Sequence, residues 1–264
     1  MADKPQKGIG VVTGASGGIG YELAKLLAAD GHDLVLVARS EFKLQEIARE
    51  FSANYRIAVT SLVQDLAKPQ AVGEIVRALE DGGRPIEVLI NNAGVGTFGL
   101  FQEQPLGKIL ELLQINIVSL TELTHRLLPR MIEQGHGRVM NVASTAAFQP
   151  GPLMAVYYAS KAYVLHFSEA IGEELRDSRI TVTALCPGPT ASGFEQSAQM
   201  QGSKLFTGRR VMSAEKVARI GYSAMWDGQA VVIPGFTNRF LAWATRLPPR
   251  SWLPKLARWA QEKS

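Results

Sequence analysis

A tyrosine and a lysine stand four residues apart where they could transfer a proton. The segment reads Tyr157-Tyr158-Ala159-Ser160-Lys161. On a helix, residues i and i+4 share a face, so the Lys161 ammonium would lie beside the Tyr157 phenol and favour its ionised form, while Tyr158 points elsewhere. A phenol of pKa about 10 aided in this way could exchange a proton with a carbonyl oxygen during hydride transfer. Simple packing of two tyrosines on an amphipathic helix is the alternative.

Two other polar residues could serve the same reaction. Ser144 follows the apolar run Arg138–Ala143. Its hydroxyl could stabilise charge on a substrate oxygen, or it could cap a helix. Asn116 stands inside the apolar, helix-periodic stretch Ile109–Met131. Because burying an amide is unfavourable without a partner, Asn116 either has a role at the site or is satisfied by a neighbouring backbone group.

A glycine cluster near the start of the chain could bind phosphate. The sequence Thr13-Gly14-Ala15-Ser16-Gly17-Gly18-Ile19-Gly20 follows a β-branched run and opens a helix-periodic stretch. Glycine lets the backbone turn sharply and approach a pyrophosphate, whose charge a helix N-terminus stabilises. An ordinary tight turn is the alternative, but the order strand, turn, helix favours a dinucleotide site.

The elements that must position these residues alternate along the chain. The predicted strands are Ile9–Thr13, Asp33–Ala38, Arg56–Leu62, Glu87–Ile90, Arg138–Ala143, Ile180–Leu185 and Ala230–Ile233. The predicted helices are Ile19–Ala29, Leu44–Phe51, Ala71–Leu79, Ile109–Met131 and Val156–Leu175. Almost continuously apolar strands, each followed by a helix, predict a parallel sheet covered on both faces. The fold class is therefore a doubly wound α/β domain, with its ligand at the carboxyl ends of the strands.

The composition excludes several other classes of protein. The chain has 264 residues, 46% apolar and 20% charged, which is ordinary for one globular domain. Its net charge of +4 comes from residues 234–264, which hold six Lys and Arg against one acidic residue. A nearly neutral body argues against a nucleic-acid partner. Cys186 has no second cysteine to pair with, and the four histidines lack metal-ligand spacing, so we expect no metal.

Taken together, these motifs resemble the short-chain dehydrogenase/reductase family. Its pattern Thr-Gly-x-x-x-Gly-x-Gly is matched by Thr13, Gly14, Gly18 and Gly20. The other matching segments follow in the family's order: Asn91-Asn92-Ala93-Gly94, Ser144, Tyr157 with Lys161, and Cys186-Pro187-Gly188-Pro189-Thr190. The match covers about two thirds of the chain, from Thr13 to Thr190.

The resemblance implies a Rossmann-type domain with a mostly seven-stranded parallel sheet, and it implies roles for individual residues. Ser144 would bind the substrate oxygen, and Tyr157 would exchange the proton. Lys161 would also hold the nicotinamide ribose, and Asn116 would distort its helix and anchor a water chain leading to the lysine. Thr190 would contact the nicotinamide carboxamide, although the family usually places this threonine slightly later. The implied cofactor-binding residues are Thr13, Gly14, Ser16, Gly18, Ile19, Gly20, Arg39, Asp65, Asn92, Ala93, Gly94, Tyr157, Lys161, Pro187, Gly188 and Thr190.

The end of the second predicted strand bears on the choice of cofactor. A site that selects NAD places an acidic side chain there, whereas this strand ends in Ala38-Arg39. A planar guanidinium suits a ribose 2′-phosphate, so we predict NADP(H) in preference to NAD(H). A solvated arginine at a strand end is the alternative. Asp65, after the third predicted strand, matches the family's adenine-contacting position.

The variable segments bear on the substrate. Within a predicted catalytic domain of residues 1–233, the stretch 191–212 is long, polar and poorly periodic, as is typical of a lid over a substrate. Apolar side chains in this lid and beside the motifs predict a wall for a lipophilic ketone or aldehyde: Phe194, Met200, Leu205, Phe206, Phe98, Phe101, Phe148 and Met154.

Residues 234–264 form a basic, Trp-rich extension of the same domain. Four apolar residues recur on one helical face, opposite Lys255 and Arg258: Trp252, Leu253, Leu256 and Trp259. The pattern predicts packing on the body or on a sister subunit, or else peripheral contact with an anionic membrane.

The sequence thus predicts NADPH-dependent reduction of a carbonyl to an alcohol, reversible as alcohol dehydrogenation. A non-catalytic NADP(H)-binding sensor or scaffold is the alternative, but a sensor could have lost Ser144, Tyr157 or Lys161, and all three are present. We expect a homodimer or homotetramer. Met1–Lys7 has no apolar core and no apolar run reaches the roughly 18 residues of a membrane span, so we expect a cytoplasmic location.

Overall fold

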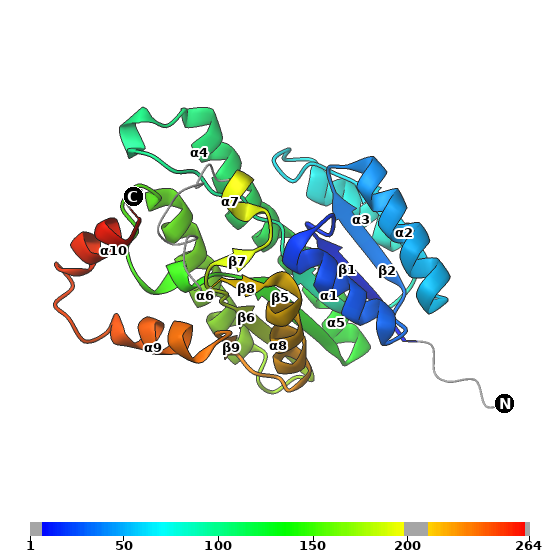
Figure 1. Ribbon diagram of the computed structural model, residues 1–264. Helices are drawn as coiled ribbons and strands as arrows, with labels where there is room; N and C mark the ends of the chain where they lie inside the picture. Colours follow the sequence, from blue (N-terminus) through cyan, green and yellow to red (C-terminus); the bar gives the residue numbers. More distant parts are fainter. Residues whose placement is uncertain (1–6, 198–210, 262–264) are drawn as a thin grey trace.

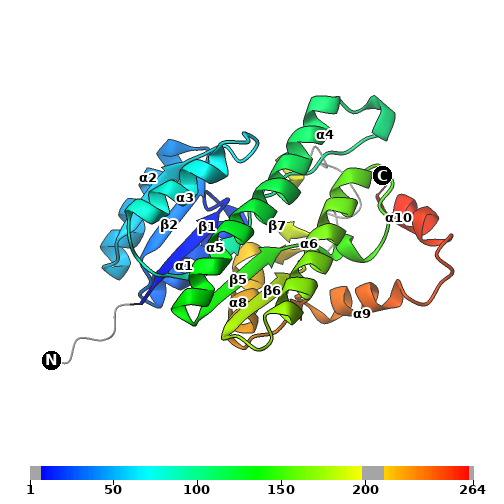
Figure 2. The same cartoon turned by 180° about the vertical axis from the view of Figure 1, so that it is seen from behind.

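A seven-stranded sheet forms the centre of the computed structural model, which describes residues 7–197 and 211–261 (Figures 1 and 2). The strand order is β3-β2-β1-β4-β5-β6-β9, and every neighbouring pair is parallel. The strands are β1 (Ile9–Thr13), β2 (Leu34–Ala38), β3 (Val59–Val63), β4 (Ile86–Asn91), β5 (Gly137–Val142), β6 (Ile180–Leu185) and β9 (Val231–Val232). The predicted doubly wound fold is confirmed.

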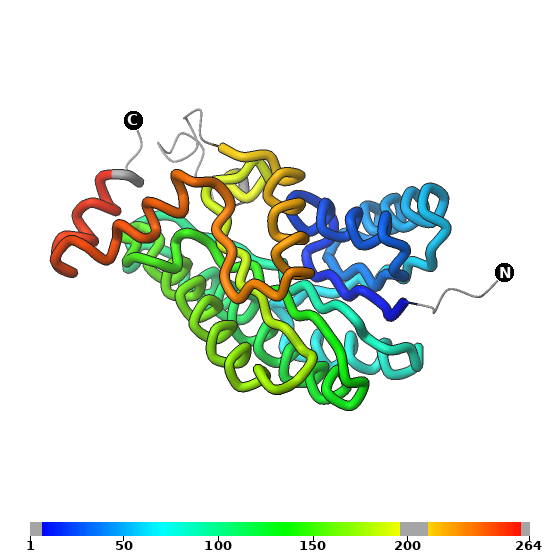
Figure 3. The backbone as a smooth tube through the Cα atoms, turned by 90° about the horizontal axis from the view of Figure 1, so that it is seen from below, coloured from blue at the N-terminus to red at the C-terminus, as the bar shows by residue number. Residues whose placement is uncertain are grey.

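Helices cover both faces of the sheet, the blue and orange ones on one side in Figure 3 and the green ones on the other. The first layer contains α1 (Gly18–Ala29), α2 (Glu41–Tyr55) and α8 (Ala214–Trp226), and the second α3 (Ala71–Asp81), α5 (Leu120–Gln134) and α6 (Ala155–Glu174). Successive strand residues point to opposite faces, so Val12 packs in one core cluster and Val11 in the other. The strands are apolar throughout for this reason.

The winding of the chain reverses between β1 and β4, which lie side by side in the sheet. The Thr13 hydroxyl accepts hydrogen bonds from the backbone N–H groups of Asn92 (3.0 Å) and Ala93 (3.1 Å). In return, the Asn92 amide donates to the carbonyls of Thr13 (3.0 Å) and Gly14 (3.1 Å). This reciprocal clamp joins the glycine turn to the segment after β4 at the edge where ligands bind.

The predicted helix Ile109–Met131 carries a π-helical turn, so the chain runs through α4 (Leu106–Leu113), η2 (Gln114–Ser119) and α5. Asn116 is buried in that turn. Its amide donates to the Val95 carbonyl (2.9 Å) and the Ser160 hydroxyl (3.0 Å), and its oxygen accepts from the Val95 N–H (2.9 Å). The distortion implied by the resemblance is confirmed, and the amide is also satisfied by neighbouring backbone.

Several elements differ from the predictions. Helix α8 was not predicted, and β3 begins later than expected because Arg56 ends α2 in the left-handed conformation (φ 57°). The predicted lid contains β7 (Thr190–Ala191), α7 (Phe194–Ser197) and β8 (Met212–Ser213), while its residues 198–210 lie outside the described chain. The other short elements are η1 (Phe101–Glu103), η3 (Thr145–Phe148), α9 (Phe236–Ala244) and α10 (Leu253–Gln261).

A chain of buried amides and hydroxyls fixes α5 and α6 against the sheet. The Asn91 amide donates to the Thr124 hydroxyl and to the Asn141 side-chain oxygen, both at 2.9 Å. The Asn141 amide donates to the Ser168 hydroxyl, also at 2.9 Å. These bonds link β4 and β5 to the two helices and so restrict how α6 can rotate.

Replacing Asn141 tests this network. Asn141→Leu leaves Asn91 and Ser168 without these partners, and we expect the free energy of unfolding to fall by about 1–3 kcal/mol in urea titrations. Thr183→Val is the matched control, because Thr183 is buried and its hydroxyl has no hydrogen-bond partner within the described chain. It should be neutral or stabilising. Equal losses from the two variants would contradict the role of the network.

Candidate active site

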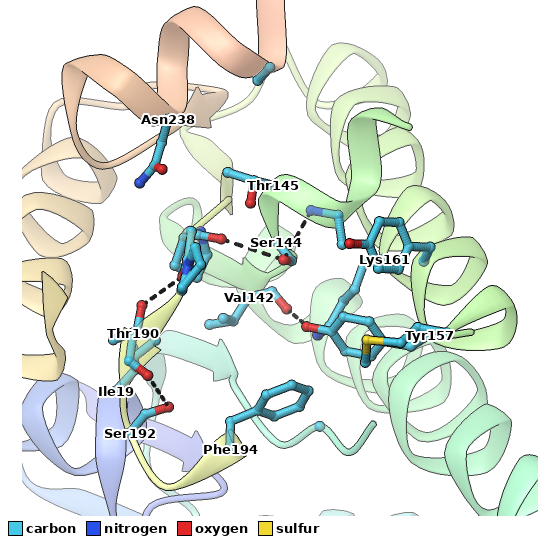
Figure 4. A pocket seen from close by; sticks show the side chains of 18 of the residues that line it. Ile19, Val142, Ser144, Thr145, Tyr157, Lys161, Thr190, Ser192, Phe194 and Asn238 are labelled. Carbon is cyan, nitrogen blue, oxygen red and sulfur yellow. Dashed lines mark hydrogen bonds between the residues drawn. The ribbon is translucent and has the colours of Figure 1, made fainter. Parts of the chain in front are cut away.

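A cavity of about 980 Å³ runs along the carboxyl ends of the strands. It brings together thirteen of the predicted site residues: Gly14, Ser16, Gly18, Ile19, Asn92, Ala93, Gly94, Ser144, Tyr157, Lys161, Pro187, Gly188 and Thr190. Figure 4 shows side chains from separate elements directed around this pocket. Five predicted residues do not line it: Thr13, Gly20, Arg39, Asp65 and Asn116.

The glycine turn forms one end of the cavity. Gly14 and Gly18 have φ angles of 65° and 56°, which favour glycine. A Cβ on Gly20 would collide with the Asn92 side chain and the Gly14 carbonyl, whereas a Cβ on Gly17 would meet no atom within 4 Å. Gly17 also gives α1 no side-chain cap. Because the first N–H groups of a helix lack intrahelical partners, this end of the cavity fits a pyrophosphate.

Ser144, Tyr157 and Lys161 lie together beyond the glycine turn (Figure 4). The Ser144 hydroxyl follows β5, accepts from the Ala146 N–H (3.1 Å) and donates to the Pro187 carbonyl (3.4 Å). The Lys161 Nζ lies 5.9 Å from the centre of the Tyr157 ring and donates to the Val142 carbonyl at 2.7 Å. The shared helix face is confirmed.

Burial dominates the electrostatics of this group. Burial raises the pKa of the Tyr157 phenol above its usual range, and a hydrogen bond with Ser144 opposes the rise. Burial lowers the pKa of Lys161 to about 8. Desolvation is the largest contribution to the Tyr157 pKa, and Lys161 directs its hydrogen bond to the Val142 carbonyl. Stabilisation of the phenolate by the Lys161 ammonium stays a prediction. Tyr157 remains protonated at neutral pH, and that form can donate a proton.

The two residues predicted to bind the adenosine part of the cofactor, Arg39 and Asp65, do not line the cavity. Arg39 is 64% exposed, with Nη1 3.9 Å from the Glu111 carboxylate of α4. Asp65 accepts from the Ala67 N–H (3.1 Å) in the turn after β3. Lys43 of α2 does line the cavity, and sequence reasoning missed it. The sequence could have indicated this residue, because Lys43 follows Arg39 by four residues just after the second strand.

The far wall of the cavity comes from the C-terminal extension, which was not among the predicted site segments. Leu241 and Ala242 of α9 and Leu256 and Ala257 of α10 line it. Asn238 of α9 lies over Gly188, since a Cβ on that glycine would come within 2.5 Å of its amide nitrogen. The extension therefore packs along the body of its own chain.

The expected apolar wall is only partly as predicted. Met154 lines the cavity, and Phe194 of α7 does so with its ring centre 5.2 Å from that of Tyr157. Phe98 packs in the same cluster as Tyr157. Phe148 packs instead against a different core cluster, and Phe101 is exposed, so neither lines the cavity. The predicted lid residues Met200, Leu205 and Phe206 fall outside the described residues.

The described residues contain neither a metal-binding cluster nor a membrane-spanning helix. Across residues 7–197 and 211–261, no cluster of three His, Cys, Asp or Glu side chains is arranged to hold a metal ion. Among the helices of that same part of the chain, none combines the length and the apolarity needed to cross a membrane.

Comparison with known proteins identifies the family. The family model described as short chain dehydrogenase matches residues 9–202. The chain is 31% identical over 251 residues to the very-long-chain 3-oxoacyl-CoA reductase of Anas platyrhynchos, covering 93% of this chain and 77% of that protein. It is 30% identical over 223 residues to a Homo sapiens protein named inactive hydroxysteroid dehydrogenase-like protein 1, covering 83% and 67%.

Solved structures show the same likeness. A short-chain dehydrogenase from Sphingobium yanoikuyae in complex with NADPH superposes with a TM-score of 0.83 and 32% identity, covering 91% of this chain and 93% of that one. The bulky-bulky ketone specific alcohol dehydrogenase from Comamonas testosteroni gives 0.79 and 27%, covering 91% and 92%. The chain belongs to the short chain dehydrogenase family of oxidoreductases.

The buried lysine should lower the stability of the fold. With a pKa of about 8 in the folded protein against 10.5 for a free lysine, Lys161 opposes folding at pH 7 by up to about 3 kcal/mol. Lys161→Met should therefore raise the free energy of unfolding at pH 7. The gain should shrink between pH 8 and 10.5, because there the folded wild type has released a proton that the unfolded chain still binds.

Urea unfolding across this pH range measures the effect. Lys216→Met, at an exposed position of α8, is the control and should change stability by less than about 0.5 kcal/mol at any pH. A Lys161→Met protein less stable than wild type at pH 7 would show that the hydrogen bond to Val142 outweighs desolvation.

Proposed function

We propose that this protein is an NADPH-dependent carbonyl reductase, reversible as an alcohol dehydrogenase. The observation that carries the proposal is the placement of Ser144, Tyr157 and Lys161 in the same cavity as an uncapped, glycine-lined helix N-terminus. The phosphate-binding turn and the proton donor are then two ends of one binding site. Bound NADPH would supply the hydride that reduces the carbonyl carbon.

The side chains of the site have separate roles in the rest of the proposed reaction. Ser144 donates its hydroxyl hydrogen to the carbonyl oxygen of the substrate and stabilises the charge that develops there. Tyr157 gives its proton to that oxygen, and the raised pKa keeps the phenol protonated until then. The Lys161 ammonium, held beside the ring, stabilises the phenolate that results. Asn116 forms hydrogen bonds with Val95 and Ser160 and so positions the first turns of α6, which carry Tyr157 and Lys161.

A preference for NADP(H) follows from two cations at the adenosine end. Arg39 directly follows β2, where an NAD-selecting site would have a carboxylate, and Lys43 of α2 lines the cavity. Both would attract a 2′-phosphate. The similar short-chain dehydrogenase from Sphingobium yanoikuyae, whose structure contains NADPH, supports the same cofactor. Asp65 would contact the adenine and Thr190 the nicotinamide.

We propose a lipophilic ketone or aldehyde as the substrate. Met154 and Phe194 pack beside Tyr157, and Leu241 adds apolar surface elsewhere in the cavity lining. The names of the relatives, a reductase of very-long-chain 3-oxoacyl-CoA and a dehydrogenase of bulky ketones, point the same way. The homodimer or homotetramer and the cytoplasmic location stay predictions.

A cofactor-binding sensor or scaffold without turnover is the second candidate function. It is favoured by relatives that are named inactive. The intact group of Ser144, Tyr157 and Lys161 favours the enzyme, because a sensor has no use for a proton donor aimed into the cavity.

Tyr157→Phe tests the proposal. It should lower the rate of NADPH oxidation with a bulky aromatic ketone by about 10²–10⁴-fold, because the proton donor is lost, while the Kd for NADPH measured by fluorescence stays within a few-fold of wild type. Tyr163→Phe on the same helix is the control, because that hydroxyl bonds Thr121 outside the cavity. No wild-type turnover across a panel of aliphatic, aromatic and steroidal carbonyls, with tight NADPH binding, would favour the sensor.

Arg39→Asp tests cofactor choice. The lost charge-assisted contact and the new repulsion should weaken NADPH binding by about 10–100-fold, while NADH binding changes little. Titration of each cofactor measures both constants, and Arg49→Asp, exposed on α2, controls for net charge. Equal losses for the two cofactors would refute contact between Arg39 and the 2′-phosphate.

A further inference from the structure

Helix α9 has one apolar face that lines the cavity and a second apolar face that points away from it. On the first face, Ala242 is buried and Leu241 is 52% exposed at the cavity. The opposite face carries three large exposed side chains at spacings of four and three residues: Phe236 (78% exposed), Phe240 (54%) and Trp243 (54%). Leu247, three residues beyond the end of α9, is also exposed (67%). Trp252, just before α10, is 60% exposed. Figures 1 and 2 show α9 and α10 at the outer edge of the molecule, away from the sheet.

Basic side chains border this aromatic surface. Arg239 lies on α9 among the aromatic residues, and Arg246, Arg250 and Lys255 follow the helix in the chain. None of these four cations forms an ion pair with any part of the chain that the structure describes. Residues 234–261 contain no Asp or Glu at all, although the rest of the chain is nearly neutral. The surface therefore combines exposed aromatic rings with uncompensated positive charge.

Two partners could cover such a surface, and charge distinguishes them. In a twofold-symmetric contact with a second copy, the same patch meets itself, and because residues 234–261 hold no acidic side chain, the cations of one copy would meet only positive charge on the other. An anionic bilayer supplies the opposite charge, and its interfacial zone accepts aromatic rings beside arginine and lysine. The charge pattern therefore favours lipid over a second subunit.

We propose that this surface, which we term the docking face, binds the surface of an anionic phospholipid bilayer. The docking face consists of Phe236, Phe240, Trp243, Leu247 and Trp252 with Arg239, Arg246, Arg250 and Lys255. The rings enter the interface while the cations contact lipid phosphates. Because α9 also walls the cavity, docking brings the cavity beside the lipid, where an apolar carbonyl compound would be concentrated. That last consequence rests on the proposed function, whereas docking does not.

Vesicle co-sedimentation tests docking without any turnover. The full-length protein should pellet with phosphatidylcholine vesicles that contain phosphatidylglycerol and stay in solution with phosphatidylcholine alone. High salt should release it, because screening weakens the contacts with lipid phosphates. Tryptophan emission should shift to the blue on binding, since Trp243 and Trp252 leave water.

Paired variants separate the docking face from general surface properties. Phe240→Ser with Trp243→Ser, and separately Arg239→Glu with Arg246→Glu, should each weaken partition into anionic vesicles by about tenfold or more. Phe42→Ser removes from α2 an aromatic ring that is more exposed (72%), and Arg49→Glu with Arg77→Glu makes the same charge change elsewhere. Both controls should bind vesicles as wild type does. All variants should keep the wild-type unfolding midpoint and Kd for NADPH.

Three results would overturn the proposal. The wild type could stay in the supernatant with anionic vesicles at low salt, or it could bind neutral vesicles equally well. It could also form an oligomer that Phe240→Ser with Trp243→Ser dissociates, which would assign the docking face to a second copy of the chain. A protein that docks on vesicles but reduces no carbonyl would refute the proposed function and leave the docking proposal intact.

Discussion

The reciprocal hydrogen bonding of Thr13 and Asn92 is the constraint on which the site depends. It joins the loops after β1 and β4 at the point where the winding of the sheet reverses. The Asn92 amide fixes the conformation of the glycine turn by binding the carbonyls of Thr13 and Gly14. This arrangement requires glycine at position 20, because a side chain there would collide with Asn92 and the Gly14 carbonyl. A rigid turn with an open helix N-terminus can then hold a charged ligand without reorganisation.

The reacting group is built at some cost to stability. Lys161 is buried and hydrogen-bonded to one carbonyl, and its depressed pKa reports an ammonium held away from water. A purely structural position would favour an apolar residue. The buried amides of Asn91, Asn116 and Asn141 compensate by holding α6 firmly to the sheet, so the Tyr157 phenol and the Lys161 amine keep a fixed relation.

The C-terminal extension lines one wall of the cavity and also adds an exposed aromatic and basic surface to the domain. One side of α9 closes the cavity with Leu241 and Ala242, and the other presents aromatic and basic side chains to the outside. A single helix with two apolar faces must be covered twice, or else leave one face in water. The proposed docking face therefore lies on the same helix that lines the cavity.

Local apolar periodicity and short spacings in the sequence were enough to predict the sheet, the glycine turn and the pair Tyr157 and Lys161, and the family resemblance added Ser144. The sequence did not reveal that α9 and α10 wall the cavity, that Lys43 lines it or that burial raises the Tyr157 pKa, because these features arise from packing in three dimensions. Distant segments meet there, and desolvation depends on everything packed around a group. The local signal for α8 was present, since Ser213 caps its start and its buried residues recur at helical spacing, but the prediction missed it. The late start of β3 was missed because a left-handed Arg56 overrides the local pattern there.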